Sequence, residues 1–210
     1  MTARLAVALL SVVGAFAIAA PARADEVATC HGPLSASETT FVQNVQHDLT
    51  ARFAHASDAL AAGYVRYTEP DDTGAISYAN KQWNSDPAHP SQLFYDSDGN
   101  LMGADFSVPR PNGEPRPRLW GVDPCRWFEF NGHVHYVARI PDTGKMLYDQ
   151  WIWDNDFVAA GGNLSKPSAD TIVKAGRVPN ANYIVTIFEL PTQWDLIVWV
   201  KPHPPNQLFW

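Results

Sequence analysis

Apolar residues recur every three or four positions in the first segment of the chain that is not part of its N-terminal leader. Ser35 and Glu38 have the spacing of a capping box at a helix start. The residues that then fall on one helical face are Phe41, Val45, Leu49, Phe53, Ala56 and Leu60. Gly63 follows, and glycine commonly ends helices because it tolerates a left-handed backbone. The pattern predicts one long helix between Ser35 and Gly63.

After Gly63 the pattern changes to short runs of alternating and β-branched residues, typical of strands. We expect strands over residues 64–68, 76–78, 92–95, 101–108, 126–140, 145–153, 183–190 and 194–200. Asn131-Gly132 lies within the run 126–140 and predicts a two-residue hairpin turn, in which both turn residues have positive φ. A second hairpin is expected around residues 96–100. Pro167 begins a short helix that should end at Gly176.

These elements predict an α+β fold. One long N-terminal helix should pack on a mainly antiparallel β-sheet, and a short second helix should lie between strands. The long loops are residues 69–91 and 109–118, which are rich in proline or small polar residues.

The first 24 residues have the pattern of a cleavable signal peptide. Arg4 precedes an uncharged, mainly apolar run, and Ala22-Arg23-Ala24 fits the small-x-small cleavage pattern. The run from Leu5 to Ala20 is shorter than the roughly 20 residues that span a bilayer. We therefore expect removal of residues 1–24 and export of a single soluble domain, 25–210, to the periplasm or the medium, without a membrane partner.

Charge and composition narrow the choice of partner. Residues 25–210 carry 13 basic and 22 acidic side chains, a net charge of −9, which argues against nucleic acid. We expect the partner to be a small molecule, a metal ion or a protein. No phosphate-binding loop, nucleophile elbow or zinc-protease motif is present in the sequence. Any catalytic residues stay unassigned.

Cys30 and Cys125 are the two cysteines of the chain. In an exported protein, two cysteines predict one disulfide bond. The alternative is two free thiols.

His133 and His135 form the clearest candidate site. The predicted hairpin pairs Phe130 with His133 and Phe128 with His135, so that both imidazoles lie on one strand face. The opposite face is expected to contribute to the core through Trp127, Val134, Tyr136, Ala138 and Ile140. The histidine face would then be turned to solvent or to a cleft.

Two imidazoles on one face can chelate a transition metal, here zinc or copper. His203 is the third ligand that we expect, and His89 and Asp105 are further candidates. The alternatives are two ordinary histidines on a half-exposed strand, or a metal-free polar pocket.

The chain is also rich in aromatic residues, with eight tryptophans. Trp151 and Trp153 should share one strand face, where they can form a stacking platform for a flat ligand. With Phe128 and Phe130 they are the predicted lining of a ligand pocket. A simpler interpretation places most aromatic residues in the core.

Several short stretches resemble a family of uncharacterised secreted bacterial proteins. They are Ala61-Ala62-Gly63-Tyr64, Leu93-Phe94-Tyr95, residues 103–109 (GADFSVP), Leu119-Trp120-Gly121 and residues 194–199 (WDLIVW). Relatives often carry histidines in the last strand, where this sequence has Gln193 and Ile197. The resemblance implies secretion and one shared domain, and it implies no activity.

Together these features predict an exported binding protein of unknown ligand, with metal binding by the histidine pair as the sharpest hypothesis. One alternative is a secreted hydrolase or lyase whose cleft is lined by Phe128, Phe130 and the histidines. Another is a carbohydrate-binding or structural interaction module.

Overall fold

A computed structural model describes residues 30, 32–82, 86–203 and 207–209. The predicted signal peptide, residues 1–24, lies outside this part. Within the described ranges, no helix combines the length and the apolar character needed to cross a bilayer.

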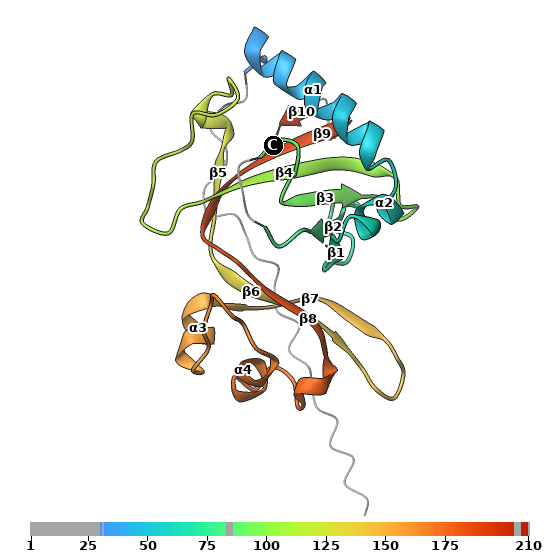
Figure 1. Ribbon diagram of the computed structural model, residues 1–210, viewed down its shortest axis with the longest axis vertical. Coiled ribbons are helices and arrows are strands. Elements are labelled where there is room, and N and C mark those ends of the chain that lie inside the picture. Colours follow the sequence, from blue (N-terminus) through green and yellow to red (C-terminus); the bar gives the residue numbers. More distant parts are fainter. Residues whose placement is uncertain (1–29, 31, 83–85, 204–206, 210) are drawn as a thin grey trace, which may run out of the picture.

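The structure confirms the α+β class, with two antiparallel sheets where the sequence suggested one (Figure 1). The larger sheet has the order β1-β2-β3-β4-β9-β10, and β5 also pairs with β9. Its strands are β1 (Val65–Arg66), β2 (Ile76–Ala79), β3 (Gln92–Tyr95), β4 (Leu101–Pro109), β5 (Phe128–Phe130), β9 (Gln193–His203) and β10 (Gln207–Phe209). The smaller sheet has the order β7-β6-β8, with strands Met146–Trp153, His133–Arg139 and Ile184–Leu190.

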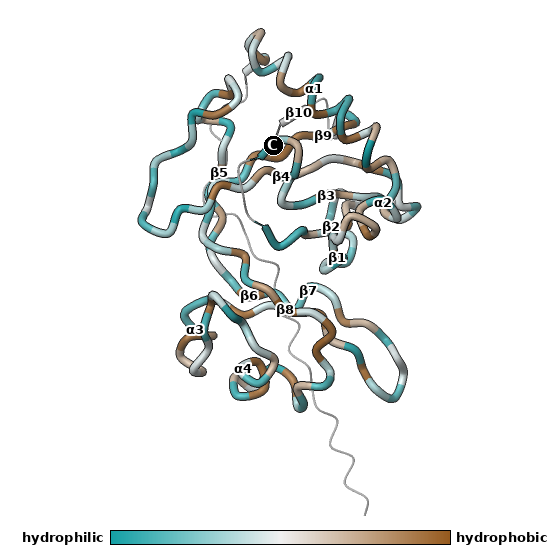
Figure 2. Tube along the Cα trace, viewed as in Figure 1, coloured by the Kyte–Doolittle hydropathy of each residue, from teal (hydrophilic) through white to brown (hydrophobic). Residues whose placement is uncertain are grey.

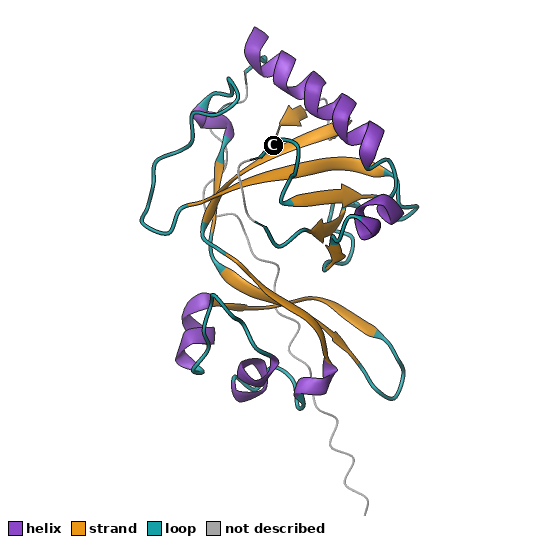
Figure 3. Cartoon of the chain, in the orientation of Figure 1, coloured by secondary structure: helices purple, strands orange, loops and turns teal. Residues whose placement is uncertain are grey.

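Helices cover the outer side of each sheet (Figure 3). Helix α1 (Ala36–Arg52) lies over the larger sheet, whereas α3 (Asp154–Ala159) and α4 (Ala169–Lys174) lie beside the smaller one. Two single 3-10 turns, Pro124–Arg126 and Ala181–Tyr183, complete the elements. The short helix predicted before Gly176 is present as α4, and α3 was not predicted.

The predicted long N-terminal helix is only partly confirmed, because it is interrupted after Arg52. Helix α2 (Ala56–Ala61) starts again after a break at residues 53–55. At this break the backbone forms hydrogen bonds with the turn between β3 and β4. Ala54 O accepts from Leu101 N at 3.0 Å, and Ala56 N donates to Gly99 O at 2.9 Å. These bonds replace the intrahelical ones that a continuous helix would need. Gly63 ends the segment with φ of 91°.

The larger core lies between α1 and the larger sheet. The apolar stripe predicted from the sequence is buried here at Phe41, Val45 and Leu49, against residues of β4 and β9 that include Phe106 and Leu196. In Figure 2, apolar stretches of β4 and β9 lie beneath α1. The capping box at Ser35 and Glu38 is formed as predicted.

The predicted hairpin at residues 96–100 is confirmed by the pairing of β3 with β4. The predicted hairpin at Asn131-Gly132 is wrong. Phe130 pairs with Gln193 and, three residues further on, His133 pairs with Leu190 in unchanged register. The chain therefore runs straight from β5 into β6, and β8 into β9, as one two-stranded ribbon that joins both sheets.

Gly132 serves a close approach in this ribbon rather than a turn. Neither Asn131 nor Gly132 belongs to the described residues with positive φ, as a type I′ turn would require. A Cβ atom on Gly132 would lie 2.1 Å from Asp154 Oδ2 and 3.0 Å from Thr192 N. Gly132 N also donates to Thr192 Oγ1 at 3.0 Å. Glycine is needed because two other segments contact the backbone directly.

A second core lies under the smaller sheet. Val134, Tyr136 and Ala138 pack there against residues of β7, α3 and α4, as expected for this face of the strand. Trp127, which was assigned to the same face, belongs instead to the core under α1. The reason is the absent hairpin, which places β5 and β6 in different sheets.

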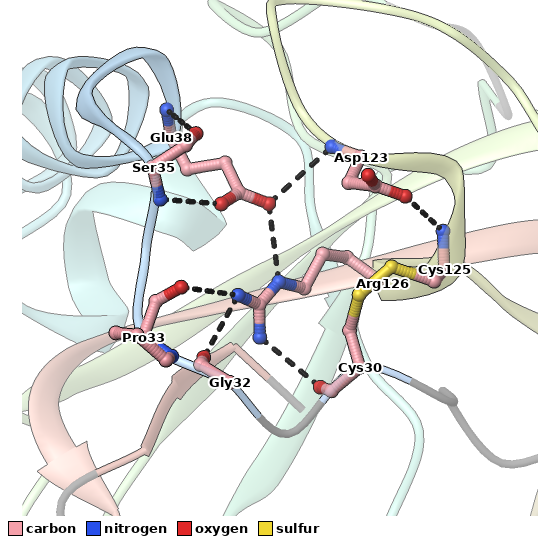
Figure 4. Close-up of a disulfide and its surroundings, with 8 residues drawn as sticks. All are labelled: Cys30, Gly32, Pro33, Ser35, Glu38, Asp123, Cys125 and Arg126. Carbon is pink, nitrogen blue, oxygen red and sulfur yellow. Dashed lines mark hydrogen bonds and ion pairs between the residues drawn. A yellow bond between two sulfur atoms is a disulfide. The ribbon is translucent and has the colours of Figure 1, made fainter.

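The predicted disulfide is present and ties the segment before α1 to the turn before β5 (Figure 4). The Cα atoms of Cys30 and Cys125 are 5.2 Å apart. Next to it, the buried Arg126 guanidinium donates to the carbonyl oxygens of Cys30, Gly32 and Pro33 at 3.0–3.3 Å. It also donates to the Glu38 carboxylate at 3.1 Å.

Candidate functional site

His133 and His135 lie side by side on β6, with ring centroids 4.8 Å apart. Their exposed fractions are 0% and 6%. We expected this face to be open to solvent or a cleft, but it packs against residues joined to the larger sheet. Tyr67, which follows β1, lies in the same buried cluster as Val137 and Phe188 of the smaller sheet.

The proton of His133 can be placed from its surroundings. His133 Nδ1 lies 2.9 Å from Asn131 O, and a carbonyl oxygen only accepts, so Nδ1 carries the proton. Nε2 then presents a lone pair, for which the described part of the chain supplies no hydrogen-bond donor. Burial lowers the pKa of His133 to about 4, so the ring is neutral at physiological pH.

His135 is enclosed by aromatic rings. Tyr67 meets it edge-on at 4.7 Å, and Phe188 lies nearly parallel to it at 6.1 Å. Burial, and then the neighbouring His133, lowers the pKa of His135 well below the usual range. No described residue forms a hydrogen bond with its Nδ1 atom.

A group of buried polar side chains occupies the face of the larger sheet opposite α1. Alternation along β4 and β9 turns Phe106 and Leu196 toward α1, and it turns their neighbours the other way. We call these neighbours the polar layer: Gln92, Asp105, Ser107, Gln193 and Asp195, all at most 6% exposed. Strand pairing places Gln92 opposite Asp105 and Ser107 opposite Asp195.

Tyr67 joins the polar layer to the histidine pair. Its hydroxyl donates to Gln92 Oε1, and Gln92 Nε2 donates to Asp105 Oδ2 at 2.7 Å. Because the Tyr67 ring also contacts His135, a chain of contacts runs from the imidazoles to the carboxylates. We call the polar layer, Tyr67 and the histidine pair the intersheet site.

The two carboxyl groups of the polar layer are strongly perturbed. Burial, and then the neighbouring Asp195, raises the pKa of Asp105 well above its ordinary value. Burial raises the pKa of Asp195 to about 7, against hydrogen bonds from Ser107 and Gln193 that lower it. Among the described residues, neither carboxylate forms an ion pair with a basic side chain.

Five buried atoms of the intersheet site have no hydrogen-bond partner among the described residues. They are Asp105 Oδ1, Asp195 Oδ1, Gln193 Oε1, His133 Nε2 and His135 Nδ1. Gln193 Nε2 donates to Asp195 Oδ2 at 3.2 Å, which fixes its Oε1 as an acceptor. Gln193 Oε1 and His133 Nε2 are therefore hydrogen-bond acceptors, and so are the two Oδ1 atoms when the carboxyl groups are ionised. Leaving such atoms unpaired is costly.

Three of the four predicted pocket aromatics surround His133. The rings of Phe130, Trp151 and Trp153 lie 5.2–6.0 Å from its ring, and the two tryptophans are 4.5 Å apart. Trp153 is 36% exposed, so the histidine end of the site lies one side chain beneath the surface. Phe128 is separated from this group, because β5 places it opposite Asp195.

The metal hypothesis meets no third ligand among the described residues. No His, Cys, Asp or Glu there forms a group with the histidine pair in which all ligand atoms lie within 4.8 Å. His89 is exposed and contacts Asp86 at 2.6 Å, and Asp105 belongs to the polar layer. The side chain of His203 lies outside the described part of the chain. Metal binding stays a prediction.

The reasoning from sequence missed Asp195, Gln193, Gln92 and Tyr67 as site residues.

Comparison with protein-family models, curated proteins and solved structures gives no match for this chain. The resemblance to secreted bacterial proteins therefore stays a prediction.

Proposed function

We propose that this chain is an exported binding protein that holds a small ligand in the intersheet site. The signal-peptide pattern of residues 1–24 supports export, and the Cys30–Cys125 disulfide agrees with an oxidising compartment.

One observation carries the binding proposal: the five buried, unpartnered polar atoms of the intersheet site. In folded proteins the large majority of such atoms are hydrogen-bonded, because an unpaired one costs on the order of 1–3 kcal/mol. Five of them in connected side chains indicate that a bound species completes their hydrogen bonding.

The geometry favours binding over the hydrolase or lyase alternative. Acid–base catalysis by histidine usually needs a carboxylate that orients the ring and stabilises its charged form. Here the backbone carbonyl of Asn131 orients His133, and burial holds both rings neutral. Neutral rings fixed in this way are suited to accepting hydrogen bonds.

Protein recovered without an affinity tag from the exported fraction tests the proposal. Its N-terminus should lie at or near Asp25. Mass spectrometry under non-denaturing conditions should show a bound small species that denaturation releases, and elemental analysis shows whether that species is a metal.

A variant pair makes this experiment specific. Combined His133→Phe and Asp195→Asn should remove the bound species, whereas His47→Phe, at an exposed position on α1, should keep it. A native mass equal to that of the polypeptide alone, in all three proteins, would contradict the proposal.

A further inference from the structure

Resting on the proposed function, we infer that the ligand of the intersheet site is a small protonated aliphatic amine. Its N–H groups would donate to the unpartnered acceptors, and its charge would face the two buried carboxylates.

The hydrogen-bonding capacity of the site gives the first reason. Gln193 Oε1 and His133 Nε2 accept hydrogen bonds, and the Oδ1 atoms of Asp105 and Asp195 accept them when their carboxyl groups are ionised. A ligand that offers only acceptors, such as a carboxylate or a phosphate, would leave them unpaired. A quaternary ammonium ion carries charge but no N–H group, so it would also leave them unpaired.

The charge of the site gives the second reason. Asp105 and Asp195 are 2% and 1% exposed, and no described basic side chain forms an ion pair with them. Burying a carboxylate is costly unless a positive charge or a proton compensates it. At a pH where these carboxyl groups are ionised, a polyol donates hydrogen bonds but leaves their charge uncompensated, whereas an ammonium group meets both demands.

The spacing of the polar atoms gives the third reason, since it favours an amine over a metal ion as the ligand. A zinc ion holds all its ligand atoms about 2.0–2.3 Å from one centre. In the part of the chain that the structure describes, no three metal-ligating side chains of this site come that close together. Tyr67 and Gln92 link His135 to Asp105, so the acceptor atoms are spread over several side chains and do not surround one point.

The aromatic side chains give the fourth reason. Trp151, Trp153 and Phe130 surround the neutral His133 ring. Such rings contact the methylene groups of an aliphatic amine and attract its positive charge. The site thus has acceptors and negative charge at the polar layer, and an aromatic wall at the histidine pair.

Calorimetric titration of the mature protein, after extensive dialysis to remove any bound species and a native mass that confirms its removal, tests the inference with four matched probes. They are 1,4-diaminobutane, the uncharged 1,4-butanediol of equal length, tetramethylammonium chloride and zinc chloride. Near pH 8 the diamine is protonated and the Asp195 carboxyl group, whose pKa is about 7, is ionised. We expect one diamine per chain, with an affinity at least about tenfold above that of the diol. Tetramethylammonium should not bind.

Two variants connect binding to the carboxylates. Asp195→Asn and Asp105→Asn keep the side-chain shape, remove one charge and should each weaken diamine binding at least about tenfold. Asp98→Asn, in the exposed β3–β4 turn, is the matched control and should bind like the parent. If a variant does not fold, the comparison of diamine with diol on the parent protein decides.

The outcomes separate this inference from the proposed function. If the diol or zinc binds and the diamine does not, the amine is wrong and the binding site stands. Diamine binding that Asp195→Asn leaves unchanged also overturns the inference, because it then occurs elsewhere. If no probe binds, the amine is wrong, and the native mass experiment decides the binding function alone.

Discussion

Arg126 and Glu38 form a buried ion pair, with Arg126 Nε 3.1 Å from Glu38 Oε1, although the residues are 88 positions apart. Glu38 also accepts from Ser35 N at 2.8 Å, as part of the helix cap. Burial alone would raise the pKa of Glu38, but hydrogen bonds from Ser35 and Arg126 outweigh it and hold this pKa below its ordinary value. One carboxylate thus joins the start of α1 to the turn beside the disulfide.

We therefore predict that Arg126→Met destabilises the fold by about 3–5 kcal/mol, since it leaves the Glu38 carboxylate buried without its cation. Urea unfolding of the oxidised protein measures this change. Arg52→Met breaks the exposed Arg52–Asp48 pair on α1 and should cost less than about 1 kcal/mol. Equal costs for the two variants would show that Arg126 contributes no more than a surface residue.

The disulfide should contribute a second, separable part of this stability. Cys30 and Cys125 are 95 positions apart, and closing a loop of that size restricts the unfolded chain by at most about 4.7 kcal/mol. The double variant Cys30→Ser, Cys125→Ser should lose a few kcal/mol in urea unfolding without loss of secondary structure by circular dichroism. A reducing agent should lower the stability of the parent equally and leave the double variant unchanged. A different response of the parent would mean that the serines have an effect of their own.

Local sequence signals predicted the elements whose cause is itself local. The turn between β3 and β4 is defined by its own loop residues and by the two strands that flank it in the sequence. The capping box is formed by residues within one four-residue segment. Asn131-Gly132 carries an equally strong turn signal, yet here glycine is required by Asp154 and Thr192, which approach it from elsewhere. A sequence pattern does not distinguish these two reasons for a glycine.

The intersheet site was predicted at its histidine end, and its polar layer only through Asp105 as a candidate metal ligand. His-x-His and the tryptophan spacing follow from alternation within one strand, so they could be found. The carboxylate pair depends on the pairing of β4 with β9, which brings together residues about 90 positions apart. The available signal was an aspartate within each of two otherwise apolar strands, at Asp105 and Asp195.

The contact at Gly132 gives a direct test of the ribbon that replaces the predicted hairpin. Gly132→Ala should destabilise the fold by about 1–3 kcal/mol, because its Cβ would overlap Asp154 Oδ2 and crowd the backbone nitrogen of Thr192. Asn131→Ala should cost less than about 0.5 kcal/mol, since Asn131 has no positive φ to maintain. Denaturant unfolding measures both changes.

Two controls identify the cause of the Gly132→Ala effect. The same change at Gly32, where a Cβ atom would meet nothing within 4 Å, should be nearly neutral. Adding Asp154→Ala to Gly132→Ala should recover part of the lost stability, with the contact to Thr192 N still in place. If Asn131→Ala costs as much as Gly132→Ala, the turn interpretation is right and the ribbon is wrong.

The buried carboxyl pair should make stability depend on pH in a stated direction. The pKa of Asp195 is about 7 in the folded chain, whereas an aspartate in an unfolded chain titrates near about 3.9. The folded state therefore binds this proton more tightly, so its stabilising contribution is complete at low pH. It is lost as the pH rises from about 4 to about 7. His133 acts oppositely, because its folded pKa of about 4 lies below the value near 6.5 expected when unfolded.

Asp195→Asn separates the two effects, because His133 is present in both proteins and cancels in their difference. Asp105 adds to this difference in the same direction, because Asp195 raises its pKa in the parent only. We predict that the stability of this variant relative to the parent grows as the pH rises from about 4 to above 7, by up to about 4 kcal/mol. Urea unfolding at several pH values, without amine in the buffer, measures this difference. Asp98→Asn should show no such slope, because Asp98 is exposed. A difference that is constant with pH, or that shrinks as pH rises, would mean that Asp195 is ionised in the folded protein throughout this range. Its charge would then already be compensated by the surrounding structure.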